Sequence, residues 1–446
     1  MSVTDRGFAA TSRVDDAGMA LALAPALTPS GPQRAPEFFR GFATRPQVLA
    51  RALGTLADIT AMRYFQYTPT TQRDPVLSAH GDRLRAECFS ACNSVYARLD
   101  VFGDGLDGGE IGFGTTNVDI TADTRRMLSG VGRTELLHLR VGDAGLTAAT
   151  PEAQSHERPV RMPTRWVPAL GNVAELHRGT SPGFTLDAAR ARAFIGSLPA
   201  ATASGRSGWL TPTSTGARLA ARPSTGAVRI AGLHRLSALR RMLPHVRGAV
   251  FHGSAETGVA VVEVDLPGAR ITLGLTEEPW RGHSGEGSLL IGLATPDALD
   301  DADLVAAMLA FEPRIDVTRL QSDTALPEAR VRSALAVLAA SGRVGWDVHD
   351  RAHFHRELPD DPDRVARDNP RLVSARRLLA SDAVRRDGAG WRVRSGDGDY
   401  LVAIDPVSCT CTWHLTHGTG RGPCKHLLAV LLAEGRIDEE NDTNDD

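Results

Sequence analysis

The first 300 residues alternate between helical and strand patterns of apolar positions. Residues 45–65 have the spacing of an amphipathic helix with Pro46 in its first turn. The apolar positions of this helix are Val48, Leu49, Leu53, Leu56, Ile59 and Met62. From residue 84 to residue 150 the apolar residues alternate with polar ones or are β-branched, and glycine-rich turns separate them, which predicts strands. A short helix is expected within this β region, at 121–132.

Helical and strand patterns continue up to residue 297. Helices are expected at 186–199 and 233–243, and strands in the segments GAVFHGS, TGVAVVEVDL and SLLIGLAT. No segment repeats at a fixed period. These patterns predict an α+β region, and its best candidate for an internal boundary is the small-residue stretch 201–208.

Residues 298–358 have the pattern of a separate helical unit. An apolar helix opens it, Asp316 is placed to cap a second helix, and Pro327 begins a third that ends at Ser341. Alternating Val344, Trp346 and Val348 then predict a small hairpin. Three helices followed by a hairpin favour the winged variant of the helix-turn-helix.

The C-terminal pattern is a helix, two strands and a final helix, and it follows a polar linker. Tyr400, Val402 and Ile404 alternate in the second strand, and the last helix begins near Lys425. The fold class expected for the whole chain is multidomain α+β, with a β-rich N-terminal region, a winged-helix-like unit and a C-terminal β-β-α zinc-binding unit. The expected domains are 36–200, 201–297 (a second α+β domain or a continuation), 298–358 and 371–436.

Both ends of the chain are expected to be irregular. Residues 1–35 are rich in Ser, Thr and Pro, which predicts a flexible arm with a short helix at 19–27. From Glu434 to Asp446 there are seven acids and one arginine, so residues 437–446 are expected to be a disordered acidic tail.

Composition restricts the class of protein. A hydrophobic fraction of 42% allows real cores, but no apolar run approaches the roughly 18 residues of a membrane span. The first thirty residues lack the layout of a secretory signal, so we expect a cytoplasmic protein with no membrane partner. The net charge is −3, and Lys425 is the only lysine beside 49 arginines. The high arginine content of the whole chain is therefore the first explanation for any arginine cluster in it.

The segment CTCTWHLTHGTGRGPCKH holds three of the five cysteines. Cys409 and Cys411 are two residues apart at the end of a strand, so both thiols point to one side. Cys424 precedes the last helix and His426 lies in its first turn, where the loop can turn the thiol back towards the imidazole. Four nitrogen and sulfur ligands suit a closed, tetrahedral, structural Zn²⁺ site. Cys409, Cys411, Cys424 and His426 are therefore the expected metal ligands.

Other interpretations of these residues are open. The three thiols could be buried free cysteines, but a polar, glycine-rich loop is a poor place for a hydrophobic role. His414 and His417 lie in the same loop and compete as ligands. A disulfide framework is not expected, because the number of cysteines is odd and no signal is present.

Cys-x-Cys, a spacer and Cys-x-His on a β-β-α unit resemble the SWIM-type zinc finger, over roughly residues 389–435. This resemblance implies a DNA- or protein-interaction module rather than a catalyst. The segments RDPVLSAHGDRLRAECFSACNSVYARLDVF and GTTNVDI also resemble bacterial SWIM proteins. Those proteins are often encoded beside MoxR-type AAA ATPases and von Willebrand A-domain proteins, which implies a protein partner of the MoxR type.

Other signals are weaker. GTSPG matches the nucleophile-elbow pattern, but Pro182 has no N–H for an oxyanion hole, so Ser181 is not expected to be catalytic. Cys88 and Cys92 are expected in the core. His349, His353 and His355 are expected in a solvated turn rather than in a metal site. No carboxylate pair or phosphate-binding loop is recognisable, and no small-molecule substrate is implied.

The leading hypothesis is a non-enzymatic, zinc-binding adaptor whose finger mediates protein interactions. The first alternative is a DNA-binding protein that uses the winged-helix-like unit and the basic patch at 371–394, which has seven arginines and two aspartates. The second alternative is an enzyme with an unrecognised site in residues 45–297. We expect any duplex binding at physiological salt to be no tighter than about 10⁻⁴–10⁻⁶ M, the range of non-specific contact.

Overall fold

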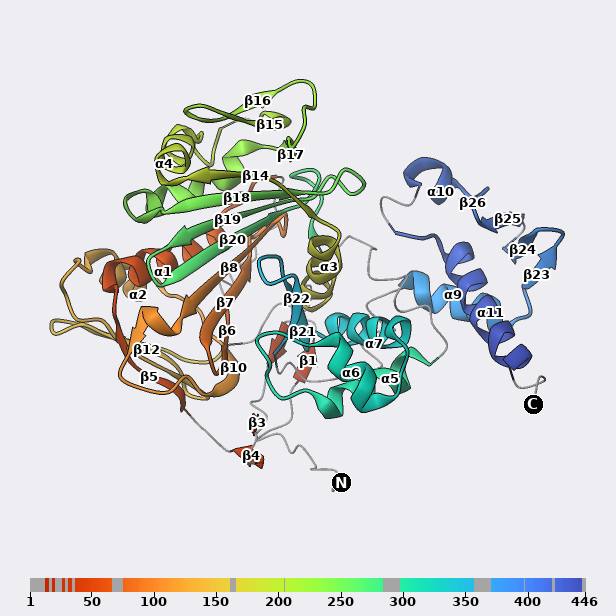
Figure 1. Ribbon diagram of the computed structural model, residues 1–446, viewed down its shortest axis with the longest axis horizontal. Coiled ribbons are helices and arrows are strands. Elements are labelled where there is room, and N and C mark those ends of the chain that lie inside the picture. Colours follow the sequence, from red (N-terminus) through yellow and green to blue (C-terminus); the bar gives the residue numbers. More distant parts are fainter. Residues whose placement is uncertain are drawn as a thin grey trace. The chain divides into compact units, whose positions relative to one another are not determined.

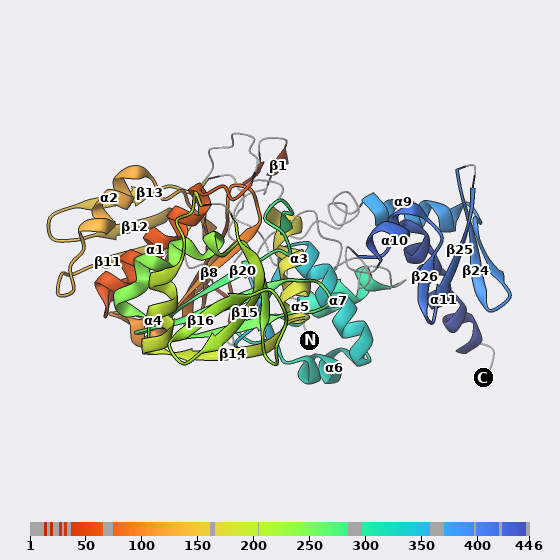
Figure 2. The ribbon, with the colours of Figure 1, turned by 90° about the horizontal axis from the view of Figure 1, so that it is seen from above.

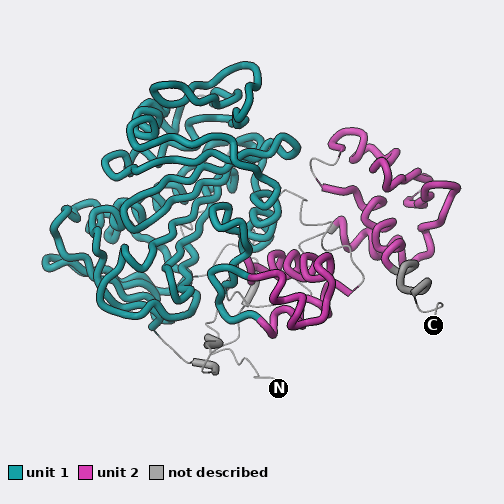
Figure 3. The backbone as a smooth tube through the Cα atoms, in the orientation of Figure 1, with its two compact units in different colours: residues 1–285, 309–315, 345–359 teal, residues 286–308, 316–344, 360–446 magenta. Residues whose placement is uncertain are grey.

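A computed structural model gives the fold of most of the chain (Figure 1). The described residues are 13–15, 18–20, 26–28, 31–33, 37–65, 75–160, 166–203, 205–283, 297–356, 370–396, 398–418 and 422–442. Two compact units are present (Figure 3), of which unit 1 comprises residues 1–285, 309–315 and 345–359, and unit 2 comprises 286–308, 316–344 and 360–446. Among the described residues, no helix has the length and apolar character needed to cross a membrane.

Unit 1 is built on an eight-stranded sheet in which every neighbouring pair is antiparallel. Figure 1 shows its strands as adjacent arrows with α1 (Pro46–Ala61) along them. In spatial order the strands are β10 (Phe113–Asn117), β6 (Val76–His80), β7 (Arg83–Phe89), β8 (Val95–Phe102), β20 (Ala269–Leu275), β19 (Ala260–Leu266), β18 (Gly248–Gly253) and β14 (Ser181–Asp187).

Smaller sheets and helices complete unit 1. A five-stranded sheet has the order β13 (Gln154–Glu157), β12 (Gly145–Ala149), β11 (His138–Gly142), β5 (Glu37–Ala43) and β9 (Leu106–Asp107). A three-stranded sheet has the order β16 (Gly216–Ala220), β15 (Ser207–Thr213) and β17 (Val228–Ala231). The helices are α2 (Ala122–Gly130), α3 (Trp166–Arg178), α4 (Ala188–Ser197) and the 3₁₀ segments η1 (Gly103–Gly105) and η2 (Leu233–His245). Paired short strands lie further towards the N-terminus: β1 (Arg13–Asp15) with β2 (Gly18–Ala20), and β3 (Ala26–Thr28) with β4 (Gly31–Gln33).

The alternation along β7 and β8 gives the large sheet two different faces. On one face Ala86, Leu99 and Val101 join the main hydrophobic core together with Leu49 and Leu53 of α1. The helix buries the apolar positions predicted for it from Val48 to Ile59 and ends at Ala61, because Met62 is extended. The prediction of this helix, with Pro46 in its first turn, is confirmed.

The other face of the sheet is charged and is nevertheless buried. Arg85, Arg98 and Asp100 are at most 1% exposed. The hairpin β21 (Val344–Asp347) and β22 (Ala352–His355) supplies the matching acid, because Asp347 pairs with Arg85 at 2.8 Å and with Arg98 at 2.9 Å. Strand alternation of this kind usually marks a solvated face, and here the polar face became interior.

More hydrogen bonds and ion pairs extend this charged layer. Asp100 accepts hydrogen bonds from Arg85 at 2.6 Å and from Arg98 at 2.8 Å. Arg356 pairs with Glu87, which also accepts a hydrogen bond from the Tyr96 hydroxyl at 2.6 Å. We call Arg85, Glu87, Tyr96, Arg98, Asp100, Asp347 and Arg356 the buried charge layer. Its members come from β7, β8 and the hairpin with the residue that follows it, all within unit 1.

The N-terminal part of unit 2 contains the helices α5 (Ala298–Met308), α6 (Val317–Thr324) and α7 (Glu328–Ala340). Asp316 caps α6 through hydrogen bonds from the Thr318 and Arg319 amides, as predicted. The predicted face of α7 at Val331, Leu335 and Leu338 is buried. The hairpin that follows has most of its residues in unit 1. The winged-helix arrangement and the domain boundaries drawn from the sequence stay predictions.

The finger in unit 2 has more elements than a β-β-α unit. Its sheet has the order β23 (Val384–Asp387), β24 (Gly390–Ser395), β25 (Gly398–Ile404) and β26 (Val407–Cys409). Its helices are α9 (Pro370–Ala380), α10 (Thr412–His417) and α11 (Lys425–Asp442), and Figure 2 shows α10 and α11 beside the strands. The mixed, β-rich fold with a C-terminal zinc-finger unit is as expected.

Several local predictions need correction. Residues 18–20 and 26–28 are strands, so the predicted helix at 19–27 is wrong where those residues are described. The helix expected at 233–243 is a 3₁₀ segment. The backbone of α11 is helical to Asp442, beyond the expected start of the acidic tail. The strand SLLIGLAT, the polar linker PDDPDRVARDNP apart from Pro370, and most of the N-terminal arm lie outside the described residues.

Candidate metal centre

The strand register of the finger brings Cys409 into its core. Val402 of β25 pairs with Cys409 of β26 on one side and with Trp391 of β24 on the other. Side chains that are paired across strands share a face, so the thiol of Cys409 lies on the same face as Val402 and Trp391. These residues belong to one hydrophobic cluster with Leu427 and Val430 of α11.

The helices α10 and α11 position the other three donors. Cys411 is the N-cap of α10, and its sulfur accepts a hydrogen bond from the His414 amide at 3.5 Å. Cys424 directly precedes α11, and its sulfur accepts one from the Leu427 amide at 3.4 Å. His426 lies in the first turn of that helix. The spacing predicted Cys411 on the strand with Cys409, but β26 ends at Cys409 and a cap position turns the second thiol inward.

The four donor atoms fit one metal ion. All of them lie within 4.8 Å of one another, and each of the four residues is buried. The Cys409 sulfur is 3.8 Å from His426 Nδ1. Bonds of about 2.0–2.3 Å to a tetrahedral Zn²⁺ place neighbouring donors roughly 3.5–3.8 Å apart. The donor set is therefore complete for zinc, with no fourth position left for water or substrate.

The thiols also perturb one another in the way expected for a cation site. The pKa of Cys424 is lowered to about 3, first because its sulfur accepts a hydrogen bond from Cys409. The same hydrogen bond and burial raise the pKa of Cys409, and burial raises the pKa of Cys411. Thiolates are the metal-binding form. A divalent cation would stabilise several thiolates at once, which hydrogen bonds among thiols cannot do.

A second layer of residues holds the donors in place. The ring of Tyr400 stacks on that of His426, with 4.1 Å between centroids and 16° between planes. Arg371 of α9 donates to the Pro423 carbonyl at 2.9 Å, next to Cys424, and lies 4.4 Å above the Trp413 ring. The Trp413 indole donates to the Gly422 carbonyl at 3.2 Å. Arg371 and Trp413 thus fix the loop from which Cys424 projects.

The competing candidates are placed elsewhere. Among the described residues, neither His414 nor His417 belongs to the group of donors within 4.8 Å. His417 packs on Trp413 with 4.6 Å between ring centroids. Cys88 is fully buried, as expected, and Cys92 is half-buried.

The remaining sequence candidates form no second site in the described chain. His353 and His355 are buried, so the expectation of a solvated turn is wrong for them. Their rings pack on Trp346 and Phe311, and the Phe311 amide donates to His355 Nδ1 at 2.7 Å. Ser181 lies at the exposed start of β14.

Two features of unit 1 were not predicted from the sequence. One is the buried charge layer, whose partners are far apart in the chain. The other is a cleft of about 900 Å³ that is lined by α1, α2 and η2. Arg51 and Asp58 lie on either side of Gly54 in α1, which is a local signal for a polar stripe on this helix, but the arginines that meet it come from distant segments.

Comparison with solved structures finds matches of low sequence identity. Proliferating Cellular Nuclear Antigen from Entamoeba histolytica is 11% identical with a TM-score of 0.37, and the match covers 54% of this chain and 98% of that one. The PCNA2-PCNA3 complex from Sulfolobus tokodaii is 8% identical with a TM-score of 0.39, covering 53% and 98%. No functional conclusion follows from similarity at these TM-scores.

Comparison with protein families gives a local and specific match. No curated protein matches the chain. The SWIM zinc finger family matches residues 400–435, which include all four donors. The predicted resemblance to this finger is therefore confirmed. Residues 400–435 are a SWIM zinc finger, and Cys409, Cys411, Cys424 and His426 are positioned in it to bind a metal ion.

Proposed function

We propose that the protein is a non-enzymatic adaptor whose SWIM finger, held by zinc, docks a protein partner. The observation that carries this proposal is the closed donor set of three thiols and one imidazole in the core of the finger. Catalytic zinc sites keep one position open for water or substrate, whereas structural sites do not. The metal would therefore fix the shape of the finger rather than perform chemistry.

The finger also exposes apolar side chains that are close in sequence to the metal ligands. Leu415 of α10 is 75% exposed, Leu401 of β25 is 50% exposed and Val407 of β26 is 44% exposed. All three fall within fifteen residues that include Cys409 and Cys411. Exposed large apolar side chains that gather in a patch mark protein-interaction sites. Leu415 lies four residues after a metal ligand, so zinc would control its presentation.

The DNA-binding alternative finds limited support in the finger. Three of the seven arginines in the 371–394 patch already bind groups within the protein. Arg371 holds the loop before Cys424, Arg386 pairs with Glu434 at 3.1 Å, and Arg392 pairs with Asp387 at 2.5 Å. Arg377, Arg385 and Arg394 remain exposed. A surface pair is easily exchanged for a phosphate, but Arg371 is committed to positioning a ligand.

The enzyme alternative was placed in residues 45–297, which contain the cleft of about 900 Å³. Its lining holds one carboxylate, Asp58, and no histidine or cysteine. Asp58 already binds Arg125 at 2.8 Å and Arg241 at 2.6 Å. A general base needs a free or poised titratable group, and this carboxylate is neutralised by two guanidinium groups. This arrangement favours the adaptor over an enzyme.

The partner proposed from the sequence resemblance is a MoxR-type AAA ATPase, and calorimetry tests it. The zinc-loaded full chain is titrated with the purified ATPase, before and after removal of zinc by a chelator. We expect Leu415→Asp to weaken binding by more than about tenfold, and zinc removal to weaken it at least as much. The matched control is Leu136→Asp, a 60% exposed leucine of unit 1, which should change nothing.

Three results would contradict the proposal. If the ATPase bound the zinc-loaded and zinc-free chains with equal affinity, the zinc-held finger would not be the docking site. If Leu415→Asp and Leu136→Asp weakened binding of the ATPase equally, the effect would not be specific to the finger. Absence of any binding to the ATPase would remove this partner from the proposal.

A further inference from the structure

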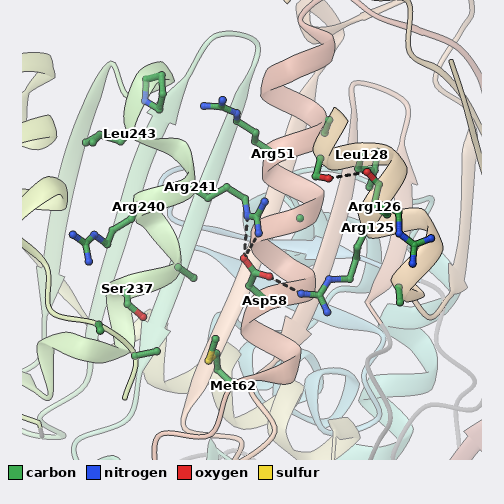
Figure 4. A pocket seen from close by; sticks show the side chains of 18 residues that line it. Arg51, Asp58, Met62, Arg125, Arg126, Leu128, Ser237, Arg240, Arg241 and Leu243 are labelled. Carbon is green, nitrogen blue, oxygen red and sulfur yellow. Dashed lines mark hydrogen bonds and ion pairs between the residues drawn. The ribbon is translucent and has the colours of Figure 1, made fainter. Parts of the chain in front are cut away.

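A cleft lies between three helical segments of unit 1, far from the finger in sequence. α1, α2 and η2 form its walls (Figure 4). Its volume is about 900 Å³. Small residues line it, among them Ala50, Gly54, Ala122 and Ala238. A Cβ at Gly54 would lie 3.4 Å from Arg241 Cδ, so the guanidinium of Arg241 lies across α1 where a longer side chain would displace it.

The cleft is strongly basic. Five arginines line it, Arg51, Arg125, Arg126, Arg240 and Arg241, against the single carboxylate of Asp58. A second cavity of about 300 Å³ shares Pro244 with the cleft and adds Arg45, Arg133, Arg192 and Arg247, with no acidic residue in its lining. We call the two together the arginine groove. Arginine is 49 of 446 residues overall but nine of the 26 that line the groove, so composition does not explain it.

Several of these charges have no acidic partner among the described residues. Arg51 and Arg240 form no ion pair there, and Arg240 instead donates to the Gly196 carbonyl at 3.4 Å. Arg126 pairs with Asp123 at 2.7 Å, but both side chains are at least 75% exposed, so this pair is weak. Figure 4 shows Arg125 and Arg241 meeting at Asp58, while Arg51 and Arg240 point away from it. The groove thus keeps an uncompensated positive charge.

The lining discriminates between classes of anion. No aromatic side chain other than His245 lines either cavity, so neither a nucleotide base nor the bases of a single strand have a broad surface to stack on. Gln47 is the only side-chain amide, so base edges would not be read. None of the strongly exposed large apolar residues lines the groove, which disfavours insertion into a membrane. What remains is repeated guanidinium groups, which suit successive phosphates.

We propose that the arginine groove of unit 1 binds the phosphate backbone of duplex DNA without regard to sequence. This site is distinct from the patch at 371–394 and does not depend on zinc or on a protein partner. Backbone binding of this kind has dissociation constants of about 10⁻⁴–10⁻⁶ M at physiological salt and tightens as salt falls. The adaptor would then be held weakly to DNA through unit 1 while the finger remains available.

Fluorescence anisotropy of a labelled duplex, titrated with the full chain over a salt series, tests the proposal. Removal of each guanidinium that binds a phosphate should reduce the slope of log K against log salt by about 1. Arg51→Ala/Arg240→Ala should therefore reduce it by about 2. Each phosphate contact contributes roughly 0.9 to the slope of log K against log salt. Without two such contacts, the fall in affinity between 50 and 200 mM salt should be about 12-fold smaller than in the wild type. Arg51→Lys/Arg240→Lys keeps both charges and should keep the slope.

Controls separate this site from other sources of binding. Arg218→Ala replaces an exposed arginine of β16 outside the groove and should leave the slope unchanged. Thermal unfolding should show that the groove variant is folded. An unchanged slope in the folded Arg51→Ala/Arg240→Ala variant, or a slope reduced only in Arg385→Ala/Arg394→Ala, would overturn the proposal. So would displacement of the duplex by inorganic phosphate at constant ionic strength, or tighter binding to phosphatidylcholine–phosphatidylserine vesicles than to the duplex.

Discussion

Replacing Asp347 by alanine should destabilise unit 1 more than any surface substitution. The Asp347 carboxylate lies between two buried guanidinium groups, 2.8 Å from Arg85 and 2.9 Å from Arg98, and none of the three side chains is more than 1% exposed. The neighbouring carboxylate, Asp100, already binds both arginines. Without Asp347, two buried positive charges would share one negative charge in an interior that water does not reach.

The size of the effect follows from this geometry. Removal of one partner from a buried ion pair costs about 3–5 kcal/mol, because the remaining charge stays desolvated. Asp347→Ala also deletes the acceptor for the His349 amide, which donates to Asp347 at 3.0 Å. A loss of about 4 kcal/mol is a large part of the roughly 5–15 kcal/mol that stabilises a typical domain. Asp347→Asn keeps an acceptor and the shape but not the charge, and should lie between the wild type and the alanine variant.

The same carboxylates predict the response to acid. Burial alone would raise the pKa of Asp347, but Arg98 and Arg85 hold it well below its ordinary value. The pKa of Asp100 is lowered by the same arginines against the effect of burial. A carboxyl group with a depressed folded-state pKa stabilises the protein above its unfolded value of about 3.9. Unit 1 should therefore lose this stability as the pH falls below about 4.

Hydrogen exchange of peptides from β7 and β8, with urea unfolding, measures the loss within unit 1. The control is Asp123→Ala, whose side chain is 85% exposed and pairs with Arg126, and it should cost less than about 1 kcal/mol. The reasoning would be refuted if Asp347→Ala cost no more than Asp123→Ala. It would also be refuted if the alanine variant kept the wild-type dependence on acid, because the buried carboxylate would then contribute nothing.

Three further predictions concern the metal centre. Purified protein should carry about one zinc per chain by atomic emission. Cys409→Ser or Cys424→Ser should abolish zinc binding. Full zinc content in the double variant Cys409→Ser/Cys411→Ser would contradict the assigned ligands. A chelator should remove hydrogen-exchange protection from the finger, residues ~385–436, and leave unit 1 protected. The reason is that zinc binding contributes about 10–16 kcal/mol to the folding of such units. Unchanged protection of the finger after verified zinc loss would refute this prediction. Arg371→Ala should lower zinc affinity about 10–100-fold in a competition assay with a chromogenic chelator, since the loop before Cys424 loses its anchor. Arg371→Lys should rescue little, because lysine lacks the planar group that lies on Trp413; equal affinities of the alanine variant and the wild type would show that the loop holds itself.

The metal centre could be predicted because its signal is local. All four donors lie within eighteen residues, and the spacing of two thiols and then a thiol and an imidazole restricts where a strand and a helix can place them. The helix at 46–61 was equally accessible, since its apolar spacing and Pro46 are contained in one segment. The sequence pattern did not predict every structural detail within these segments. The cap position of Cys411 depends on α10, a helix of six residues with no buried face to mark it.

The buried charge layer could not be predicted because its signal is not local. Arg85 and Asp347 are separated by 262 residues, and alternation along β7 and β8 is the same for a solvated face and for a face covered by charged partners. The arginine groove escaped for a related reason. Its arginines come from α1, α2, α4, η2 and the connections between them, and each is ordinary in a chain so rich in arginine.

The position of the hairpin in the chain has a consequence for synthesis. Asp347 and Arg356, which neutralise the charged face of the large sheet, follow α5, α6 and α7 in sequence. When the ribosome has made only the first 300 residues, all eight strands of the sheet have been synthesised, but Glu87, Arg85 and Arg98 lack their final partners. Domains generally fold as units during translation. Unit 1 cannot complete its fold before residues 345–356 are synthesised. Its nascent chain is therefore an incomplete folding unit from the end of β20 at Leu275 until that hairpin is made.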